Sequence, residues 1–292
     1  MSLFKGCGVA IVTPFKDGIV DKESMGKLLE WHVAEGTDAI IVCGTTGEAS
    51  TMPDDEHLDT IKFVVDTIDG RIPVIAGTGG NDTRHSIDLS VEAEKLGADG
   101  LLHVTPYYNK ASQKGLIKHY TAIADSVNIP IILYNVPGRT GVNLLPSTVL
   151  ELSKHKNIKG LKEASGIIAQ VVEVARLMPD DFYLYSGNDE MVVPLMSVGG
   201  AGVISTVANI VPKEMHDMAN HFLKGDIKKA AELQLKLKPL IDAMFVEVNP
   251  MPIKVAVSLM HHCSSEVRLP LCELEDSSLE KVKKTMTTYG LI

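Results

Sequence analysis

The chain alternates short apolar runs with longer amphipathic segments along most of its length. Eight runs are rich in Val and Ile: GVAIVTPF, DAIIVCGTT, PVIAGTG, GLLHVTP, PIILYNVP, IKGLKEAS, FYLYSGND and GVISTVAN. The segments between them have helical periodicity. DDEHLDTIKFVVDTI, for example, opens on acidic residues, which suit the N-terminus of a helix. The pattern predicts eight strands that alternate with helices.

The apolar runs are continuous, which is typical of parallel strands that are covered on both faces. A repeat of about 30 residues matches one βα unit, and eight such units close a (β/α)8 TIM barrel of typically ~250 residues. We therefore predict an α/β protein with a catalytic barrel over residues 1–224 and a helical extension over residues 225–292 that packs on it. An open, doubly wound sheet is the alternative that the pattern alone leaves standing.

The composition narrows the class of protein. With 292 residues, 45% of them hydrophobic and 22% charged, the chain can form a large core and is too apolar for disorder. A net charge of -9 and 5% aromatic residues argue against a nucleic-acid surface. No apolar stretch approaches the ~20 residues of a membrane span, and MSLFKGCGVA lacks the pattern of a signal peptide. The four cysteines show no close pairing, so we expect reduced thiols and a cytoplasmic protein without membrane or nucleic-acid partners.

Small or polar residues follow nearly every predicted strand. They form the clusters TP, GTTGE, GTG, TPYYN, YNVP, KE, SGND and ST. In a (β/α)8 barrel the carboxyl ends of all strands meet at one face, and reactive groups gather there. The sequence therefore predicts a functional site on this rim, which an open sheet would not assemble in the same way.

Lys162 lies near the end of the apolar run IKGLKEAS. An ordinary lysine with a pKa near 10.4 has about one neutral amine in 2,500 at pH 7, which makes it a poor nucleophile. Burial favours the neutral amine and prepares such a lysine for Schiff-base chemistry, whereas pairing with Glu163 is the structural alternative. Adjacent strand residues point to opposite faces, so Glu163 would not share a site with an inward-facing Lys162. This alternation favours a catalytic lysine.

Other residues of the rim have chemistry that suits a small acid. The turn GTTGE offers two hydroxyls and a run of backbone N–H groups for a carboxylate, although a turn like this can serve geometry alone. Tyr134 has a phenol that can transfer protons, and Arg139 has a planar cation for a second carboxylate; a core tyrosine and a solvated arginine are the alternatives. The adjacent His261 and His262 would diverge on a helix, and we predict no metal.

These motifs together resemble the dihydrodipicolinate synthase family, a branch of the pyruvate-dependent aldolases that include N-acetylneuraminate lyase. GTTGE, TPYYN, YNVPGRTG, the lysine of KEASG, YSGND and GVIS occur in the order and spacing of that family, over the whole chain. The resemblance implies that pyruvate forms a Schiff base with Lys162 and condenses, as an enamine, with L-aspartate 4-semialdehyde to give 4-hydroxy-tetrahydrodipicolinate. No further cofactor is implied. A sister aldolase that acts on a sugar-derived aldehyde and a non-catalytic keto-acid-binding barrel are the alternatives.

The resemblance also assigns roles to individual residues. It implies that Tyr134, Thr45 and Tyr108 form a proton relay, in which Tyr108 reaches in from a neighbouring subunit of a homotetramer built as a dimer of dimers. The substrate contacts that it implies are Thr46 for the pyruvate carboxylate, Arg139 for the semialdehyde carboxylate, and backbone groups of Gly187 and Ile204 around the lysine.

In some members of the family free lysine inhibits the enzyme at a site between subunits. The matching residues here are Ala49, Ser50, Asp54, His57, Asn81, His85 and Tyr107. Two of them depart from the pattern of lysine-sensitive members. Asp54 stands where these members often have a histidine, and His85 where they have a glutamate that anchors the effector. We expect weak inhibition or none.

Overall fold

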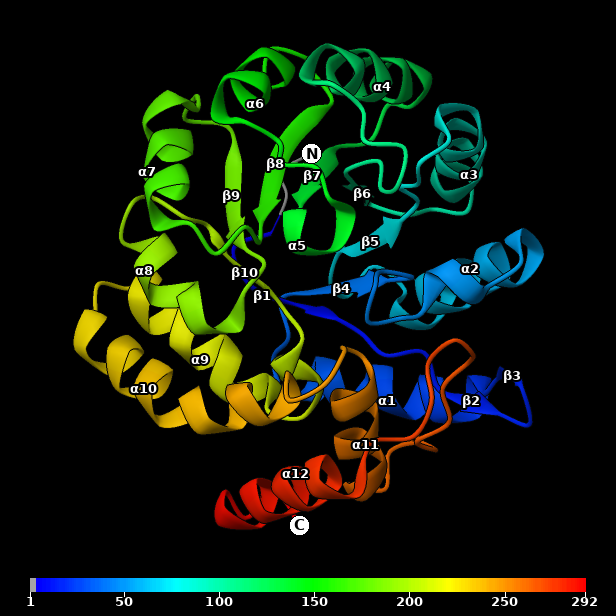
Figure 1. The fold of residues 1–292 in the computed structure, drawn as a ribbon, viewed down its shortest axis with the longest axis vertical. Coiled ribbons are helices and arrows are strands. Elements are labelled where there is room, and N and C mark those ends of the chain that lie inside the picture. Colours follow the sequence, from blue (N-terminus) through cyan, green and yellow to red (C-terminus); the bar gives the residue numbers. More distant parts are fainter. Residues whose placement is uncertain (1–3) are drawn as a thin grey trace.

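Eight parallel strands close into a barrel in the computed structural model, which describes residues 4–292 (Figure 1). The strands are β1 (Gly6–Ala10), β4 (Ala39–Val42), β5 (Val74–Gly77), β6 (Gly100–Val104), β7 (Ile131–Asn135), β8 (Ile158–Glu163), β9 (Tyr183–Ser186) and β10 (Gly202–Ser205). Each strand pairs with the next, and β1 pairs with both β4 and β10. This closure confirms the predicted TIM barrel and excludes the open sheet.

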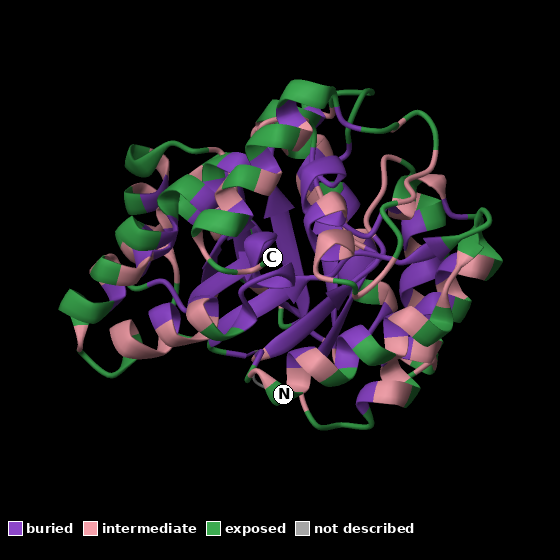
Figure 2. Ribbon diagram, turned by 90° about the horizontal axis from the view of Figure 1, so that it is seen from below, coloured by how far each residue is buried: buried purple, intermediate pink, exposed green. Residues whose placement is uncertain are grey.

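Helices surround the barrel. They are α1 (Lys22–Ala34), α2 (Asp54–Ile68), α3 (Thr83–Lys95), α4 (Gln113–Ser126), α5 (Pro137–Thr140), α6 (Pro146–Leu152), α7 (Ile168–Leu177), α8 (Val192–Met196) and α9 (Pro212–Leu223). The acidic segment chosen from the sequence is α2, whose first turn contains Asp54, Asp55 and Glu56. Figure 2 shows buried strands inside and exposed outer faces on the helices, which is the layering that continuous apolar strands require.

Three further helices follow the barrel: α10 (Ile227–Met244), α11 (Met251–Leu259) and α12 (Asp276–Thr288). They lie together beside α1 and α9 at the lower edge of Figure 1. Leu237 and Val257 belong to the same buried cluster as Val9 and Leu161 of the barrel strands, so the extension and the barrel share one core. The division into domains at residues 224 and 225 stays a prediction.

The structure also has elements that the hydrophobic pattern did not predict. A hairpin of β2 (Phe15–Lys16) and β3 (Ile19–Val20) follows β1, and α5 stands between β7 and α6. These segments are too short to show a period. The expectation that His261 and His262 lie on a helix is wrong, because α11 ends at Leu259 and His261 has a left-handed backbone, with φ of 63°.

Candidate active site

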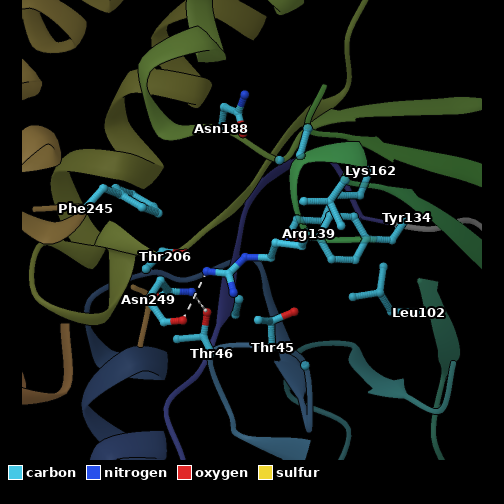
Figure 3. A pocket seen from close by; sticks show the side chains of 15 residues that line it. Thr45, Thr46, Leu102, Tyr134, Arg139, Lys162, Asn188, Thr206, Phe245 and Asn249 are labelled. Carbon is cyan, nitrogen blue, oxygen red and sulfur yellow. Dashed lines mark hydrogen bonds between the residues drawn. The ribbon is translucent and has the colours of Figure 1, made fainter. Parts of the chain in front are cut away.

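A pocket of about 80 Å³ opens at the carboxyl end of the barrel strands. Figure 3 shows its side chains, which come from the ends of several strands, from α5 and from the segment before α11. The candidate residues that line it are Thr45, Thr46, Tyr134, Arg139, Lys162 and Gly187. The barrel therefore brings six of the eight predicted catalytic and substrate-binding residues to one place.

Lys162 lies on β8 in register with Tyr134 on β7, and its Nζ atom is 4.5 Å from the centre of the Tyr134 ring. The residue is only 5% exposed. Burial lowers the pKa of its amine to about 8, against an opposing effect of the buried Asp189 carboxyl; the charge of Arg139 lowers it further. A pKa of 8 leaves about one amine in ten neutral at pH 7, since each pH unit is a factor of ten.

Glu163 lies on the other face of β8, as strand alternation predicts. Its carboxylate accepts hydrogen bonds from Asn135 Nδ2 at 3.0 Å and from the backbone N–H of Ser165 at 2.6 Å. Gln170 of α7 donates to the same carboxylate. Since these groups satisfy Glu163 between the barrel and the helices, Lys162 has no ion pair with its neighbour in sequence.

Gly187 gives the lysine side chain its room. A Cβ atom at this position would lie 3.1 Å from Lys162 Cγ and 2.7 Å from Ala164 Cβ. The second of these distances is too short for real side chains. A larger residue after β9 would therefore displace Lys162 or the strand end that carries it.

Asp189 is a buried carboxyl near the lysine that the sequence analysis did not select. One of its oxygens, Oδ2, accepts hydrogen bonds from the N–H groups of Thr206 and Val207 at 3.1 and 3.0 Å. The other, Oδ1, has no hydrogen-bond partner among residues 4–292. Burial raises the pKa of Asp189, while Ser205, these N–H groups and Lys162 act in the opposite direction. It is the last residue of the predicted rim motif SGND, and that position is the signal that could have identified it.

Tyr134 lies at the end of β7 with its side chain in the pocket. Burial raises the pKa of its phenol, and the Arg139 charge and the Thr45 hydroxyl act in the opposite direction. The phenol is therefore protonated at neutral pH. Arg139 and Thr45 stabilise the phenolate that forms when it gives up that proton. This suits a side chain that both donates and accepts protons.

The GTTGE turn presents Thr45 and Thr46 to the pocket. Thr46 Oγ1 accepts a hydrogen bond from Asn249 Nδ2 at 3.0 Å. The turn uses the N–H groups of Gly47, Glu48 and Ala49 to bind its own carbonyls, which corrects the expectation of a free run of donors. The N–H groups of Thr45 and Thr46 have no acceptor within residues 4–292, and they lie beside the two hydroxyls.

Arg139 lies on the short helix α5 at the mouth of the pocket. Its Nη2 donates to the backbone carbonyl of Asn249 at 3.1 Å, one of the two contacts drawn in Figure 3. The residue is exposed, so part of its guanidinium is free to meet a ligand from solvent. Asn249 thus links the arginine to Thr46, and neither this residue nor Phe245, which also lines the pocket, was selected from the sequence.

Two candidates lie outside the pocket. Ile204 is fully buried on β10 inside the barrel, in a cluster with Tyr134 and Tyr185. Tyr108 follows β6 with a left-handed backbone, at φ of 70°, and is 88% exposed. Within one chain Tyr108 therefore does not reach the lysine.

A second cavity of about 460 Å³ adjoins the first and shares Thr45, Tyr134 and Arg139 with it. The candidate effector residues that line it are Ala49, Ser50, Asp54, His57, His85 and Tyr107. Asn81 does not line it but donates from Nδ2 to the carbonyl of Tyr107 at 3.2 Å. His85 Nε2 lies 2.9 Å from Asp54 Oδ1, so the two residues that depart from the sensitive pattern contact each other.

Within residues 4–292, no group of three or more His, Cys, Asp or Glu side chains is arranged to hold a metal ion. None of the helices there has the length and apolar character needed to cross a membrane.

Comparisons with known proteins agree in family and in fold. The model of the dihydrodipicolinate synthetase family matches residues 3–289. The 4-hydroxy-tetrahydrodipicolinate synthase of Caldicellulosiruptor bescii is 58% identical over 292 residues, which cover 100% of this chain and 99% of the relative. The crystal structure of dihydrodipicolinate synthase from Thermotoga maritima has a TM-score of 0.98 at 43% identity and covers 99% of this chain and 100% of its own. That of the Acinetobacter baumannii enzyme, complexed with pyruvate, has a TM-score of 0.97 at 44% identity and covers 99% of each chain.

Proposed function

The chain belongs to the dihydrodipicolinate synthetase family, and we propose that Lys162 performs the reaction of this family through a covalent imine with pyruvate. The reaction condenses pyruvate with L-aspartate 4-semialdehyde to 4-hydroxy-tetrahydrodipicolinate, the first committed step of diaminopimelate and lysine synthesis. The observation that carries the assignment to Lys162 is its burial at the open end of the barrel with a pKa of about 8.

The proposed chemistry starts with the neutral amine of Lys162, which attacks the ketone carbon of pyruvate and, after loss of water, forms a protonated imine. This cation withdraws electrons from the neighbouring methyl group, which loses a proton and becomes the nucleophilic carbon of an enamine. The enamine adds to the aldehyde carbon of the semialdehyde and forms the new C–C bond. The amine of that substrate then displaces Lys162 and closes the six-membered ring. The imine is itself the electron sink, so the sequence of steps needs no cofactor.

Tyr134 is the proposed proton donor and acceptor of these steps. Its phenol lies in the pocket beside Lys162, and Thr45 acts on its pKa from the GTTGE turn. Tyr108 is the proposed outer end of this relay. Its 88% exposure supports a role in which it enters the pocket of a neighbouring subunit. A dimer would then be the smallest active unit, and a homotetramer made of two such dimers is the proposed assembly.

The two substrates carry carboxylates, and two parts of the site suit them. Thr46, with the N–H groups of its turn, is the proposed contact of the pyruvate carboxylate. Gly187 and Ile204 are assigned to backbone contacts around the imine, and the absence of a side chain at Gly187 leaves space for it. Arg139, a planar cation at the mouth, is the proposed contact of the semialdehyde carboxylate.

We also propose a cytoplasmic location for the enzyme. All four cysteines are free, which fits a reducing compartment. The second cavity is the proposed position of the family's effector site, where His85 and Asp54 make strong inhibition by lysine unfavourable.

Borohydride reduction in the presence of pyruvate tests the central proposal. We expect peptide mass analysis to find one reduced adduct, on Lys162, that requires pyruvate and is absent from Lys162→Arg. Lys159 lies on the same strand with its amine paired to Asp181, so it is the matched internal control that should stay unmodified. An adduct on a different lysine, or none in folded protein, would refute the assignment.

A further inference from the structure

Glu48, the last residue of the GTTGE motif, is a buried carboxylate outside the proposed reaction. It is 3% exposed and has a left-handed backbone, with φ of 57°. Its Oε1 accepts a hydrogen bond from Lys254 Nζ at 2.6 Å, and its Oε2 accepts one from the backbone N–H of Arg268 at 2.9 Å. Both partners belong to the C-terminal extension, more than 200 residues further along the chain.

Lys254 is fully buried on α11. Its Nζ lies 4.0 Å from the centre of the Phe15 ring, and the guanidinium carbon of Arg268 lies 4.2 Å from the same ring. Arg268 is fixed in turn, because it donates to the Glu56 carboxylate and to the carbonyls of Thr51 and Gly18. The Glu48 carboxylate is thus held from two directions by groups that have little freedom to move.

The same turn carries the hydroxyls that face the pocket. The N–H of Glu48 donates to the carbonyl of Thr45 at 3.1 Å, and the carbonyl of Gly47 accepts from Thr13 Oγ1 at 2.7 Å. Asn249, just before α11, donates to Thr46 Oγ1. The turn is therefore fixed between the segment that follows β1 on one side and the start of α11 on the other.

A buried ion pair contributes little to stability, because the desolvation of two charges offsets their attraction. A well-packed apolar pair in the same place often stabilises the fold equally well. A carboxylate that accepts from two fixed donors does specify position and direction. A non-glycine residue with a left-handed backbone also persists only where its surroundings hold it.

We propose that Glu48 and Lys254 are positioning residues through which the C-terminal extension holds Thr45 and Thr46 in their working geometry. The inference rests on the proposed function of those two threonines. Neither Glu48 nor Lys254 lines the pocket, so their effect passes through the turn. An error of about 1 Å in the placement of a reacting or binding group can reduce the rate ~100-fold, so a small relaxation of the turn is sufficient to matter.

The test compares Glu48→Gln, Lys254→Met and the double variant with the wild-type enzyme. Lys254→Met alone leaves a buried unpaired carboxylate and is expected to lower thermal stability, whereas the double variant removes both charges and should recover most of it. Positioning predicts that the double variant still has a kcat/KM for pyruvate reduced by roughly 10- to 100-fold. Pyruvate at saturation should still be trapped on Lys162 by borohydride. Lys238→Met, which removes an exposed ion pair with Asp242 on α10, is the matched control with no expected change.

A double variant with wild-type stability and wild-type kcat/KM would overturn the proposal. Failure of all three variants to fold would also overturn it, because the pair would then be structural. These outcomes differ from failure of the proposed function, in which the wild-type enzyme itself yields no adduct on Lys162.

Discussion

Tyr134 and Lys162 are paired in register on adjacent strands, and the Lys162 Nζ atom lies 4.5 Å from the centre of the Tyr134 ring. The ring helps to bury the amine, and burial favours its neutral, nucleophilic form. The face of an aromatic ring also attracts a cation. The same neighbour therefore suits both the free amine and the protonated imine that we propose replaces it.

The buried amine lowers the stability of the fold. A pKa of about 8, against the ordinary 10.5, corresponds to about 3 kcal/mol of unfavourable free energy while the amine is protonated. We expect Lys162→Met to raise the free energy of unfolding by about this amount at pH 7. Below pH 8 both the folded and the unfolded states are protonated, so the gain is full there; it declines to zero as the pH rises to 10.5.

Denaturant unfolding at several pH values and a fixed protein concentration measures this gain. Lys159→Met on the same strand loses a surface ion pair and is expected to change stability by less than about 1 kcal/mol. A Lys162→Met variant that is no more stable than the wild type at pH 7 would show that the amine has little desolvation cost.

The rate of imine formation should follow the neutral fraction of Lys162. We expect kcat/KM for pyruvate to rise about tenfold per pH unit below pH 8 and to level off above it. The Asp189 carboxyl raises the pKa of Lys162, so Asp189→Asn should move the midpoint of the profile to lower pH. Stopped-flow or steady-state measurements over pH 6 to about 9 test both statements. A flat profile would contradict the first, and an unchanged midpoint in the variant would mean that Asp189 is neutral.

Tyr134→Phe should separate imine formation from the later proton transfers. Loss of a proton-transfer group slows turnover by roughly 100-fold or more, whereas the amine of Lys162 remains available to pyruvate. We therefore expect a large loss of kcat with borohydride trapping retained. Tyr183→Phe, at the opposite end of the barrel strands, is the matched control that should leave turnover unchanged. Turnover near that of the wild type in Tyr134→Phe would remove this phenol from the relay.

The strands and the rim were predictable because their signals are local. Each strand is a continuous apolar run, and Lys162 and Tyr134 stand out as polar groups at the ends of such runs. Closure of the barrel then places them together, since parallel strands present their carboxyl ends at one face.

Contacts made by the C-terminal extension were not predictable in the same way. Asn249 reaches Thr46 across 203 residues, and Lys254 reaches Glu48 across 206. Neither residue interrupts a periodic pattern in a way that indicates its partner. The proposed role of Tyr108 requires a second subunit, so a single sequence gives it no geometric basis beyond the resemblance to the family.

Arg139→Ala is expected to weaken the binding of L-aspartate 4-semialdehyde far more than the binding of pyruvate. A hydrogen bond between charged groups contributes about 1.5 to 3 kcal/mol, which corresponds to a ten- to roughly 150-fold increase in KM for L-aspartate 4-semialdehyde. The KM for pyruvate should change much less, because the lysine and the GTTGE turn remain in place. Arg84→Ala, which removes an exposed arginine of α3, is the control. An equal increase in both KM values would indicate that Arg139 acts instead by fixing the Asn249 carbonyl.

Free lysine should inhibit this enzyme weakly or not at all. An effector amine needs a carboxylate partner, and position 85 supplies an imidazole where the resemblance to lysine-sensitive members of the family implies a glutamate. Asp54 places a carboxylate in the cavity wall, but its Oδ1 already lies 2.9 Å from His85 Nε2, so only part of this carboxylate remains for an effector amine. Loss of one charge-assisted contact weakens binding by about 1.5 to 3 kcal/mol, or ten- to roughly 150-fold.

A steady-state titration with lysine measures this directly, and His85→Glu should increase the sensitivity to lysine by a factor in that range. Ser277→Glu, at an exposed position on α12, is the control for an added surface charge. Strong inhibition of the wild type at submillimolar lysine, with little further change in His85→Glu, would show that the His85–Asp54 contact does not exclude the effector.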